Sequence, residues 1–345
     1  MGSLPPLQGK CLYNARVDPH LTAACKISLN VDLSLLAPLQ KVQHTFFRCL
    51  IGLNPRSMCA FLYTETGVLP LAYRCLILAL EYLQYILPLP ASHIAHCAFR
   101  ECGLLHAAGK PSWLDDLAIA IGHLPCCPPV WNPLLATEDS ITKLIADIKV
   151  SMNAHIDSVI ASSSKGHLLR GWLERDDNGM LHHQTLSFWH YLHIPVASHQ
   201  KVLAQMLLSD SSLAEVCLHH ADRHCFLVPR KWRLCRFCTD EVGDPPHAMF
   251  GCNGSPELID LWSAFLESIF LLSPSLHLAA PSAMPESFFI IALSHRHICN
   301  VLAKLAYDTL QVFGQREMFV VDSALYLNAV VPPTVISSIP SNSML

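Results

Sequence analysis

Apolar residues recur at three- and four-residue steps along most of this chain, a spacing that is typical of amphipathic helices. The pattern predicts helices over residues 40–53 and 70–87, where Pro70 suits a first helical turn and Pro88 ends the repeat. Strand-like alternation is sparse and is clearest over residues 180–187 and 318–325. We therefore expect a mostly α fold. Further helices are predicted over residues 91–108, 113–124, 138–160, 198–208, 212–224, 256–272 and 294–313.

Breaks in this pattern divide the chain into segments. Residues 1–40 contain several prolines and no sustained period, so we expect an irregular N-terminal segment there. The Ser-Ser-Ser-Lys-Gly stretch at residues 162–166 indicates a boundary between two helical regions. The expected segments after the first are a helical region at 41–161, a helical segment at 167–225, a cysteine-containing module at 226–256, a C-terminal helical segment at 257–331 and a disordered tail at 332–345.

The composition is unusually apolar, with 52% hydrophobic and 14% charged residues, so a membrane protein has to be considered. The two most apolar stretches, residues 68–87 and 261–280, are interrupted by Arg74 and Glu267, and no clean span of eighteen residues remains. We expect no membrane span. The first residues lack the apolar core of a secretory signal, which predicts an intracellular chain, nuclear or cytoplasmic.

The chain has 15 cysteines, and an odd number without a secretory signal favours reduced thiols over a disulfide framework. One group has the spacing of metal ligands, C-x2-C-x8-H-x4-C. The x2 gap brings two thiolates together on a turn, x4 is about one helical turn, and the longer arm contains glycine and prolines that favour a loop folding back. These residues predict one structural Zn²⁺ in a closed site. The ligands are Cys235, Cys238, His247 and Cys252.

Two other groups of Cys and His residues are further candidates for metal sites. In the first, His220 and His224 lie one helical turn apart and could share an ion, but a polar helix face that carries histidines explains them more simply. For the second group, which lies within residues 93–106, we expect side chains that pack or face solvent and do not bind a metal. The first group is Cys217, His219, His220, His224 and Cys225, and the second is His93, His96, Cys97, Cys102 and His106.

Cations and aromatic residues crowd the first two cysteines. Positive charge beside exposed rings is typical of modules that contact phosphates and stack on bases, so this cluster predicts binding of RNA or single-stranded DNA. The net charge of −4 restricts such contact to a local patch. The alternative is that the cations only solvate an apolar chain. The predicted contacts are Arg230, Lys231, Trp232, Arg233, Arg236 and Phe237.

Residues 220–252, HADRHCFLVPRKWRLCRFCTDEVGDPPHAMFGC, resemble the C-C-H-C zinc-binding region downstream of the reverse transcriptase in non-LTR (LINE-type) retrotransposons. Residues 191–216 are similar to the helical segment before that motif, particularly in fungal elements. Upstream, Ile51-Gly52-Leu53, Glu65-Thr66-Gly67 and Leu69-Pro70-Leu71-Ala72-Tyr73-Arg74 are similar to the helical thumb or connector stretch after the polymerase palm. The resemblance covers about residues 40–270. It implies a region that holds template RNA near a polymerase.

The polymerase itself is not expected, because its two-metal chemistry needs three carboxylates. Trp113-Leu114-Asp115-Asp116 resembles the aromatic-x-Asp-Asp hairpin, yet Lys110-Pro111-Ser112 precede it instead of an apolar strand, and no matching upstream Asp motif occurs. Acids that complement a helix dipole explain the pair better. We therefore expect a non-catalytic, zinc-dependent nucleic-acid-binding fragment.

The alternative is a helical protein–protein interaction domain derived from a degenerate mobile element. It would bind a reverse transcriptase or another protein through apolar helical faces and would not bind nucleic acid.

Overall fold

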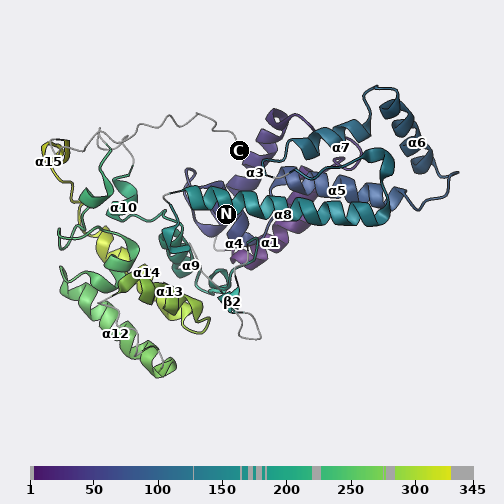
Figure 1. Ribbon diagram of the computed structural model, residues 1–345. Helices are drawn as coiled ribbons and strands as arrows, with labels where there is room; N and C mark the ends of the chain where they lie inside the picture. Colours follow the sequence, from purple (N-terminus) through teal and green to yellow (C-terminus); the bar gives the residue numbers. More distant parts are fainter. Residues whose placement is uncertain are drawn as a thin grey trace.

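The computed structural model describes residues 4–126, 128–163, 165–169, 174–175, 181–182, 185–219, 227–274, 276 and 284–327. Helices make up most of this part of the chain, which confirms the mostly α prediction. Figure 1 shows two groups of helices side by side, here called the N-terminal lobe (described residues within 4–163) and the C-terminal lobe (described residues within 185–327).

The N-terminal lobe is built around α5 (Leu71–Ile86), which packs against α3 (Leu33–Ile51), α7 (Trp113–Gly122) and α8 (Glu138–Ser162). The α5 side chains Leu80 and Leu83 are fully buried at its centre. The other elements of this lobe are α1 (Pro6–Leu12), η1 (Tyr13–Val17), α2 (Asp18–Leu21), α4 (Cys59–Thr66), α6 (Ile94–Ala107) and η2 (Pro133–Leu135), and the short η3 (His167–Leu169) follows the lobe in the chain.

Local sequence explains where several of these helices begin. Thr137 and Ser140 form a reciprocal capping box at the start of α8, which satisfies backbone N–H groups that have no partner within the helix. At the start of α7, Asp115 accepts hydrogen bonds from Ser112 Oγ and His106 Nδ1, both at 2.6 Å. Asp115 and Asp116 therefore lie in a first helical turn, as the sequence predicted, and not in a strand hairpin.

In the C-terminal lobe, α14 (Cys299–Gly314) packs against both α9 (Ala197–Leu207) and α12 (Pro256–Leu272). The remaining elements of this lobe are η4 (His190–His193), α10 (Ala214–Cys217), η5 (Arg230–Trp232), η6 (His247–Gly251), α13 (Pro285–Ser294) and α15 (Ser323–Leu327). Between the lobes in the chain, β1 (Glu174–Arg175) pairs antiparallel with β2 (Leu181–His182).

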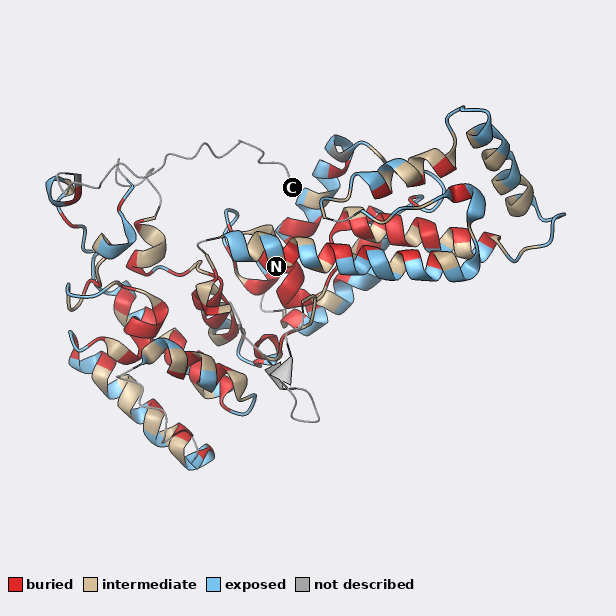
Figure 2. Cartoon of the chain, viewed as in Figure 1, coloured by how far each residue is buried: buried red, intermediate tan, exposed pale blue. Residues whose placement is uncertain are grey.

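A continuous apolar core runs through both lobes, and Figure 2 shows its buried residues in red in both groups of helices. Polar contacts also join the two lobes. Tyr191 Oη donates a 2.5 Å hydrogen bond to Glu65 Oε2, and Trp189 Nε1 donates to the Thr64 carbonyl at 3.0 Å. Burial raises the pKa of Glu65 to about 7. The junction thus depends on a carboxyl group that is removed from water.

The structure differs from the sequence prediction at four places, the first of which is α4 (Cys59–Thr66), a helix that the sequence did not predict. Residues 4–40 are more regular than predicted: they contain α1, η1 and α2, and α3 already begins at Leu33. The buried Tyr13 ring packs on Phe46 and Phe47 of α3. The ten-residue α13 was missed, since its apolar run SFFIIAL has no period. Residues 318–322 are not in a strand, and α15 follows them.

The other predicted helices lie close to their expected positions, and α8 ends at Ser162, at the predicted boundary. Of the strand expected over residues 180–187, Leu181–His182 is in a ladder. The later part of the helix expected at 212–224 and the tail at 332–345 lie outside the described residues.

Among the described residues, no helix by itself is both long enough and apolar enough to cross a membrane. One pair, α4 with α5, passes the same criterion only when the two are taken together, and it is bent by 52°.

Candidate metal centre

Cys235 and Cys238 lie on a turn that the backbone holds closed. The Thr239 N–H donates to the Cys235 carbonyl at 2.9 Å, and Thr239 adopts a positive φ of 58°. The chain then returns, so that the Cys235 N–H donates to the Glu241 carbonyl at 2.8 Å and Leu234 forms a bridge with Val242. The arm after the second cysteine therefore folds back, as its spacing predicted.

His247 and Cys252 bound a single helical turn, η6. Asp244 Oδ1 accepts from the His247 N–H at 3.0 Å and so caps the turn. The Cys252 N–H donates to the His247 carbonyl at 2.8 Å, which closes it. Both side chains consequently leave the same turn toward the two cysteines.

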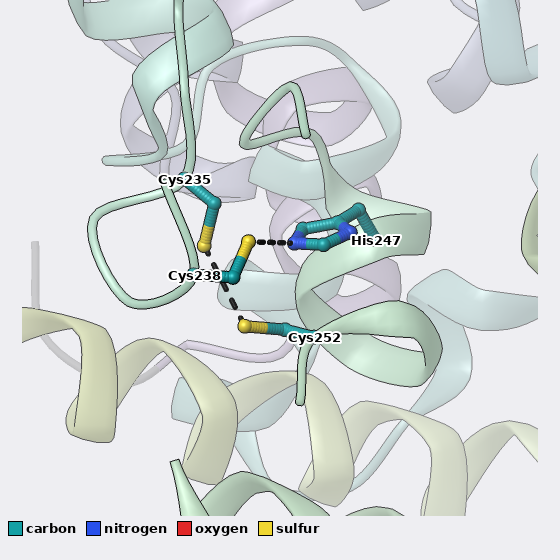
Figure 3. Close-up of side chains that lie close together, drawn as sticks. All are labelled: Cys235, Cys238, His247 and Cys252. Carbon is teal, nitrogen blue, oxygen red and sulfur yellow. Dashed lines mark hydrogen bonds between the residues drawn. The ribbon is translucent and has the colours of Figure 1, made fainter. Parts of the chain in front are cut away.

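The four side chains converge on one point, as Figure 3 shows. Their ligand atoms all lie within 4.8 Å of one another, with 3.6 Å between the sulfurs of Cys235 and Cys252 and 3.4 Å between Cys238 Sγ and His247 Nε2. Tetrahedral zinc with ordinary bond lengths needs about 3.8 Å between two sulfurs and about 3.5 Å between sulfur and nitrogen. These residues fit one metal ion.

Glu241 orients the histidine. Its Oε2 lies 2.8 Å from His247 Nδ1, which leaves Nε2 facing the thiols. A carboxylate on the far ring nitrogen fixes the tautomer that can ligate a metal and makes the ring a better ligand. Sequence reasoning missed this residue, because a single Glu in a loop carries no spacing signal.

The pKa values of Cys235, Cys252 and His247 are shifted by their contacts with one another. A hydrogen bond with Cys252, together with burial, raises the pKa of Cys235 to about 12, whereas the same hydrogen bond lowers the pKa of Cys252. Burial lowers the pKa of His247, but hydrogen bonding to Cys235 and the nearby thiols outweigh it and raise that pKa to about 9. Without a metal the group therefore retains protons, and a divalent ion would displace them.

Gly254 is a second residue that sequence reasoning missed. A Cβ at this position would lie 2.5 Å from the Phe237 carbonyl carbon and 2.6 Å from the Cys238 nitrogen. Both are backbone atoms, which cannot move aside without displacing the Cys235–Cys238 turn. The close approach of the chain after Cys252 therefore requires glycine.

In the part of the chain that the structure describes, the C-C-H-C quartet is the one convergent set found, and the rival group at residues 93–106 does not form another. His93 caps α6 through the Ala95 N–H, and His106 pairs with Asp115. Cys217 and His219 are described, whereas His220, His224 and Cys225 lie outside the described residues.

Two of the predicted phosphate contacts point inward. Arg236 is buried and donates to the carbonyls of Phe313 and Ser212, both at 2.7 Å, and of Arg316 at 2.9 Å. Arg233 is also buried; its Nε donates to the Val228 carbonyl at 2.8 Å, and its Nη1 donates to the Glu215 carbonyl of α10 at 3.1 Å. Guanidinium groups are well suited to carbonyls at the end of a helix, here that of α14. The two arginines attach the module to its neighbours, and a phosphate would not reach them.

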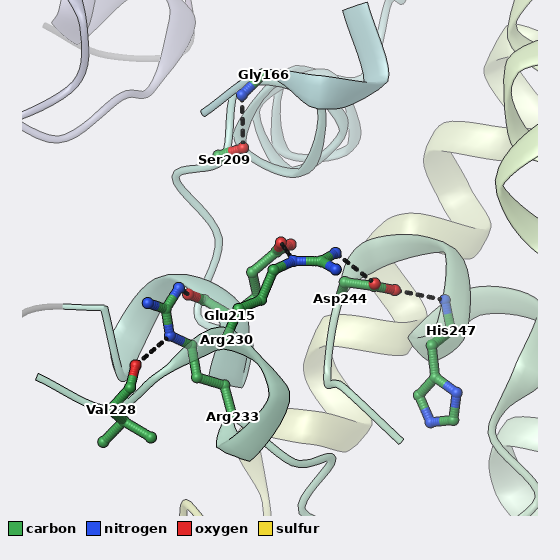
Figure 4. A network of polar contacts seen from close by, with 8 residues as sticks. All are labelled: Gly166, Ser209, Glu215, Val228, Arg230, Arg233, Asp244 and His247. Carbon is green, nitrogen blue, oxygen red and sulfur yellow. Dashed lines mark hydrogen bonds and ion pairs between the residues drawn. The ribbon is translucent and has the colours of Figure 1, made fainter. Parts of the chain in front are cut away.

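The other four predicted contacts are near the surface. Arg230 forms ion pairs with Glu215 at 2.8 Å and Asp244 at 3.2 Å, as Figure 4 shows. Lys231 is exposed, with its Nζ 5.7 Å from the centre of the Trp232 ring.

The two aromatic residues are half-buried and packed. Trp232 lies against Tyr326, and Phe237 makes an edge-to-face contact with Phe313 at 5.0 Å. The Arg316 guanidinium lies 5.0 Å over the Phe237 ring. A surface cation therefore accompanies Phe237, although it comes from a distant part of the sequence.

No family model, no curated protein and no solved structure matches this chain.

Proposed function

We propose that the chain binds one Zn²⁺ at Cys235, Cys238, His247 and Cys252, and that this ion is structural. The observation that carries the proposal is the convergence of three sulfurs and one imidazole nitrogen within 4.8 Å. Four protein ligands leave no open position for a substrate, as in structural zinc sites. Thiolates and imidazole favour zinc over magnesium or calcium.

The zinc would fasten the module to the helices of the C-terminal lobe. Phe250, on the same turn as His247, packs against Phe265 of α12 and Phe288 of α13. Arg236, next to Cys235, bonds to the end of α14. An ion that joins the two halves of the module therefore also fixes three helices.

We further propose that the zinc-organised module binds RNA or single-stranded DNA without catalysis, as the resemblance to retrotransposon reverse transcriptases implies. The surface charge available for this is smaller than the sequence suggested. Lys231 and Arg316 are the exposed cations beside the module's aromatic residues, and Arg230 is paired with acids. Phe237 with Arg316 offers a place for one base to stack.

The test is metal analysis of the purified chain together with titration of a fluorescent single-stranded RNA at several salt concentrations. One zinc per chain is expected. In a plot of log affinity against log salt concentration, contact of Lys231 and Arg316 with one strand should give a slope of about −1.4. The four cations predicted from sequence would instead give a slope of about −2.8. Metal-free protein would contradict the zinc proposal. Zinc-loaded protein that does not bind RNA would contradict the proposed nucleic-acid binding.

A matched pair of variants sharpens the RNA titration. Lys231→Ala should lower the magnitude of the salt slope by about 0.7. Lys304→Ala removes an exposed cation that pairs with Asp308 on α14, and it should leave the slope unchanged.

The exposed apolar side chains of α6 favour the competing function, a helical protein–protein interaction domain. No residue of this helix is buried, and its Ile94 and Leu104 side chains are 83% and 59% exposed. An apolar protein contact would be insensitive to salt, which separates it from nucleic-acid binding in the same titration series.

A further inference from the structure

An apolar cavity of about 240 Å³ lies in the N-terminal lobe, between α3, α4, α5, α7 and α8. Its walls include Leu36, Leu76, Ala120, Ile156 and Val159. A cavity of about 150 Å³ accommodates benzene, so this one accommodates an apolar group of about ten carbon atoms. Its lining combines such walls with a small number of polar groups, which is typical of small-molecule sites.

Those polar groups include a cysteine and a histidine in contact. Cys59 Sγ, at the first residue of α4, lies 3.5 Å from His44 Nδ1 of α3. The other ring nitrogen, Nε2, lies 2.6 Å from Tyr63 Oη. Arg48 Nη2 donates to Cys59 Sγ at 3.1 Å. Cys59, His44 and Tyr63 all line the cavity.

The arrangement suits a nucleophile with its base. The Arg48 guanidinium and the N-terminus of α4 both favour negative charge on the Cys59 sulfur. Burial, with the nearby Arg48, lowers the pKa of His44 to about 4, so the imidazole is neutral near pH 7 and one of its ring nitrogens has a free lone pair. When Nε2–H donates to Tyr63 Oη, Nδ1 is the free acceptor that faces the thiol.

We propose that Cys59 is an acyl acceptor that takes a medium-chain acyl group from an acyl thioester and holds the chain in this cavity. The Cys59 sulfur attacks the thioester carbonyl, a new S–C bond forms, and the S–C bond of the donor breaks. The Cys59 proton passes to His44 Nδ1 and then to the departing thiolate, which leaves as a free thiol. The exchange of one thioester for another needs no oxidant or reductant. It is independent of the metal site.

The experiment incubates the zinc-loaded full chain with octanoyl-CoA and measures its intact mass, with peptide mapping of the modified residue. One octanoyl group on Cys59, released by neutral hydroxylamine, is the expected result. Acetyl-CoA and palmitoyl-CoA should react more slowly, because one leaves the cavity empty and the other exceeds it. Reaction at the exposed Cys11 or Cys49, or equal rates for all three donors, would overturn the proposal.

Variants separate chemistry from folding. Cys59→Ser should abolish labelling, whereas Cys49→Ser, on the exposed side of α3, should not change it. His44→Gln should slow transfer about 100-fold, as expected when a general base is lost. Ala120→Leu should shift the preference toward butanoyl-CoA by filling part of the cavity, and an unchanged preference in a folded variant would place the acyl chain elsewhere.

Discussion

The two lobes are stabilised by different means. In the N-terminal lobe, α5 lies between long amphipathic helices, and apolar side chains such as Leu80 and Ile148 fill the interior. In the C-terminal lobe, the described part of the chain between α10 and α12 (residues 218–219 and 227–255) has little regular structure, and it carries the four side chains that could hold a metal ion and two buried arginines. Helix faces that bury enough apolar surface need no further cross-link, whereas a short irregular segment does. The candidate metal site and the two buried arginines therefore lie in the segment that has the least regular structure.

Removing the metal should have the largest effect, and it should be confined to the C-terminal lobe. Structural zinc contributes about 10–16 kcal/mol in isolated zinc-finger peptides, so chelation or Cys238→Ser should cost several kcal/mol here. Hydrogen exchange should accelerate in α12, α13 and α14 and stay slow in α5 and α8. Cys11→Ser, at an exposed thiol of α1, is the control. Unchanged exchange after complete metal removal would show that the ion does not stabilise this lobe.

The complementary change is Leu80→Ala in the N-terminal lobe. Leu80 is fully buried on α5, and such truncations cost about 2–5 kcal/mol by loss of burial and creation of a cavity. Denaturant unfolding should report this loss while the metal content stays at one ion per chain. A variant that loses its metal would show that the two lobes unfold as one unit.

Glu65→Gln tests the junction between the lobes through pH. Burial raises the pKa of this carboxyl from 4.5 to about 7, so the folded chain keeps a proton that the unfolded chain releases. The contribution of Glu65 to stability is complete below pH 4.5, falls as the pH rises to about 7 and is lost above it. The amide of glutamine can still accept from Tyr191.

The Glu65→Gln variant should therefore gain stability relative to the parent chain as the pH rises through this window, by at most about 3 kcal/mol. Thermal unfolding at a series of pH values measures the difference. Glu81→Gln, at an exposed position of α5, should show no such trend.

Gly254→Ala tests the close approach beside Cys238. The added methyl group would meet backbone atoms of Phe237 and Cys238, so we expect a loss of about 1–3 kcal/mol and weaker metal binding. Gly103→Ala in α6 is the matched change, because nothing lies within 4 Å of its Cβ and alanine favours a helix. Calorimetry of both variants, with and without chelator, makes the comparison. Equal effects of the two changes would contradict the steric argument.

The smallest effect should come from Glu241→Gln. Loss of the Glu241 carboxylate charge beside His247 Nδ1 should weaken metal affinity about tenfold, or about 1.4 kcal/mol. This is the lower end for such partners, because Glu241 is 70% exposed. Competition with a chromophoric chelator measures the change. Asp240→Asn, at the adjacent exposed residue, should not alter the affinity.

The four candidate metal ligands and most of the helices could be predicted from the sequence alone. Cys235, Cys238, His247 and Cys252 lie within eighteen residues, so local turns suffice to bring them together and their spacing is visible in the chain. The apolar period likewise located α5, α8 and α12 because each buries one face. Where a segment is apolar on every side, as in α13, the period vanishes and the prediction failed.

Tertiary structure alone decided the roles of the cations and of the second Cys–His pair. The Arg236 guanidinium can donate to a phosphate as well as to a carbonyl. Only the packing of α14, about eighty residues later in the chain, places carbonyls beside it and buries it. Cys59 and His44 come from separate helices whose crossing places them 3.5 Å apart. Contacts between residues far apart in the chain depend on how helix faces pack, and no spacing rule in the sequence encodes that.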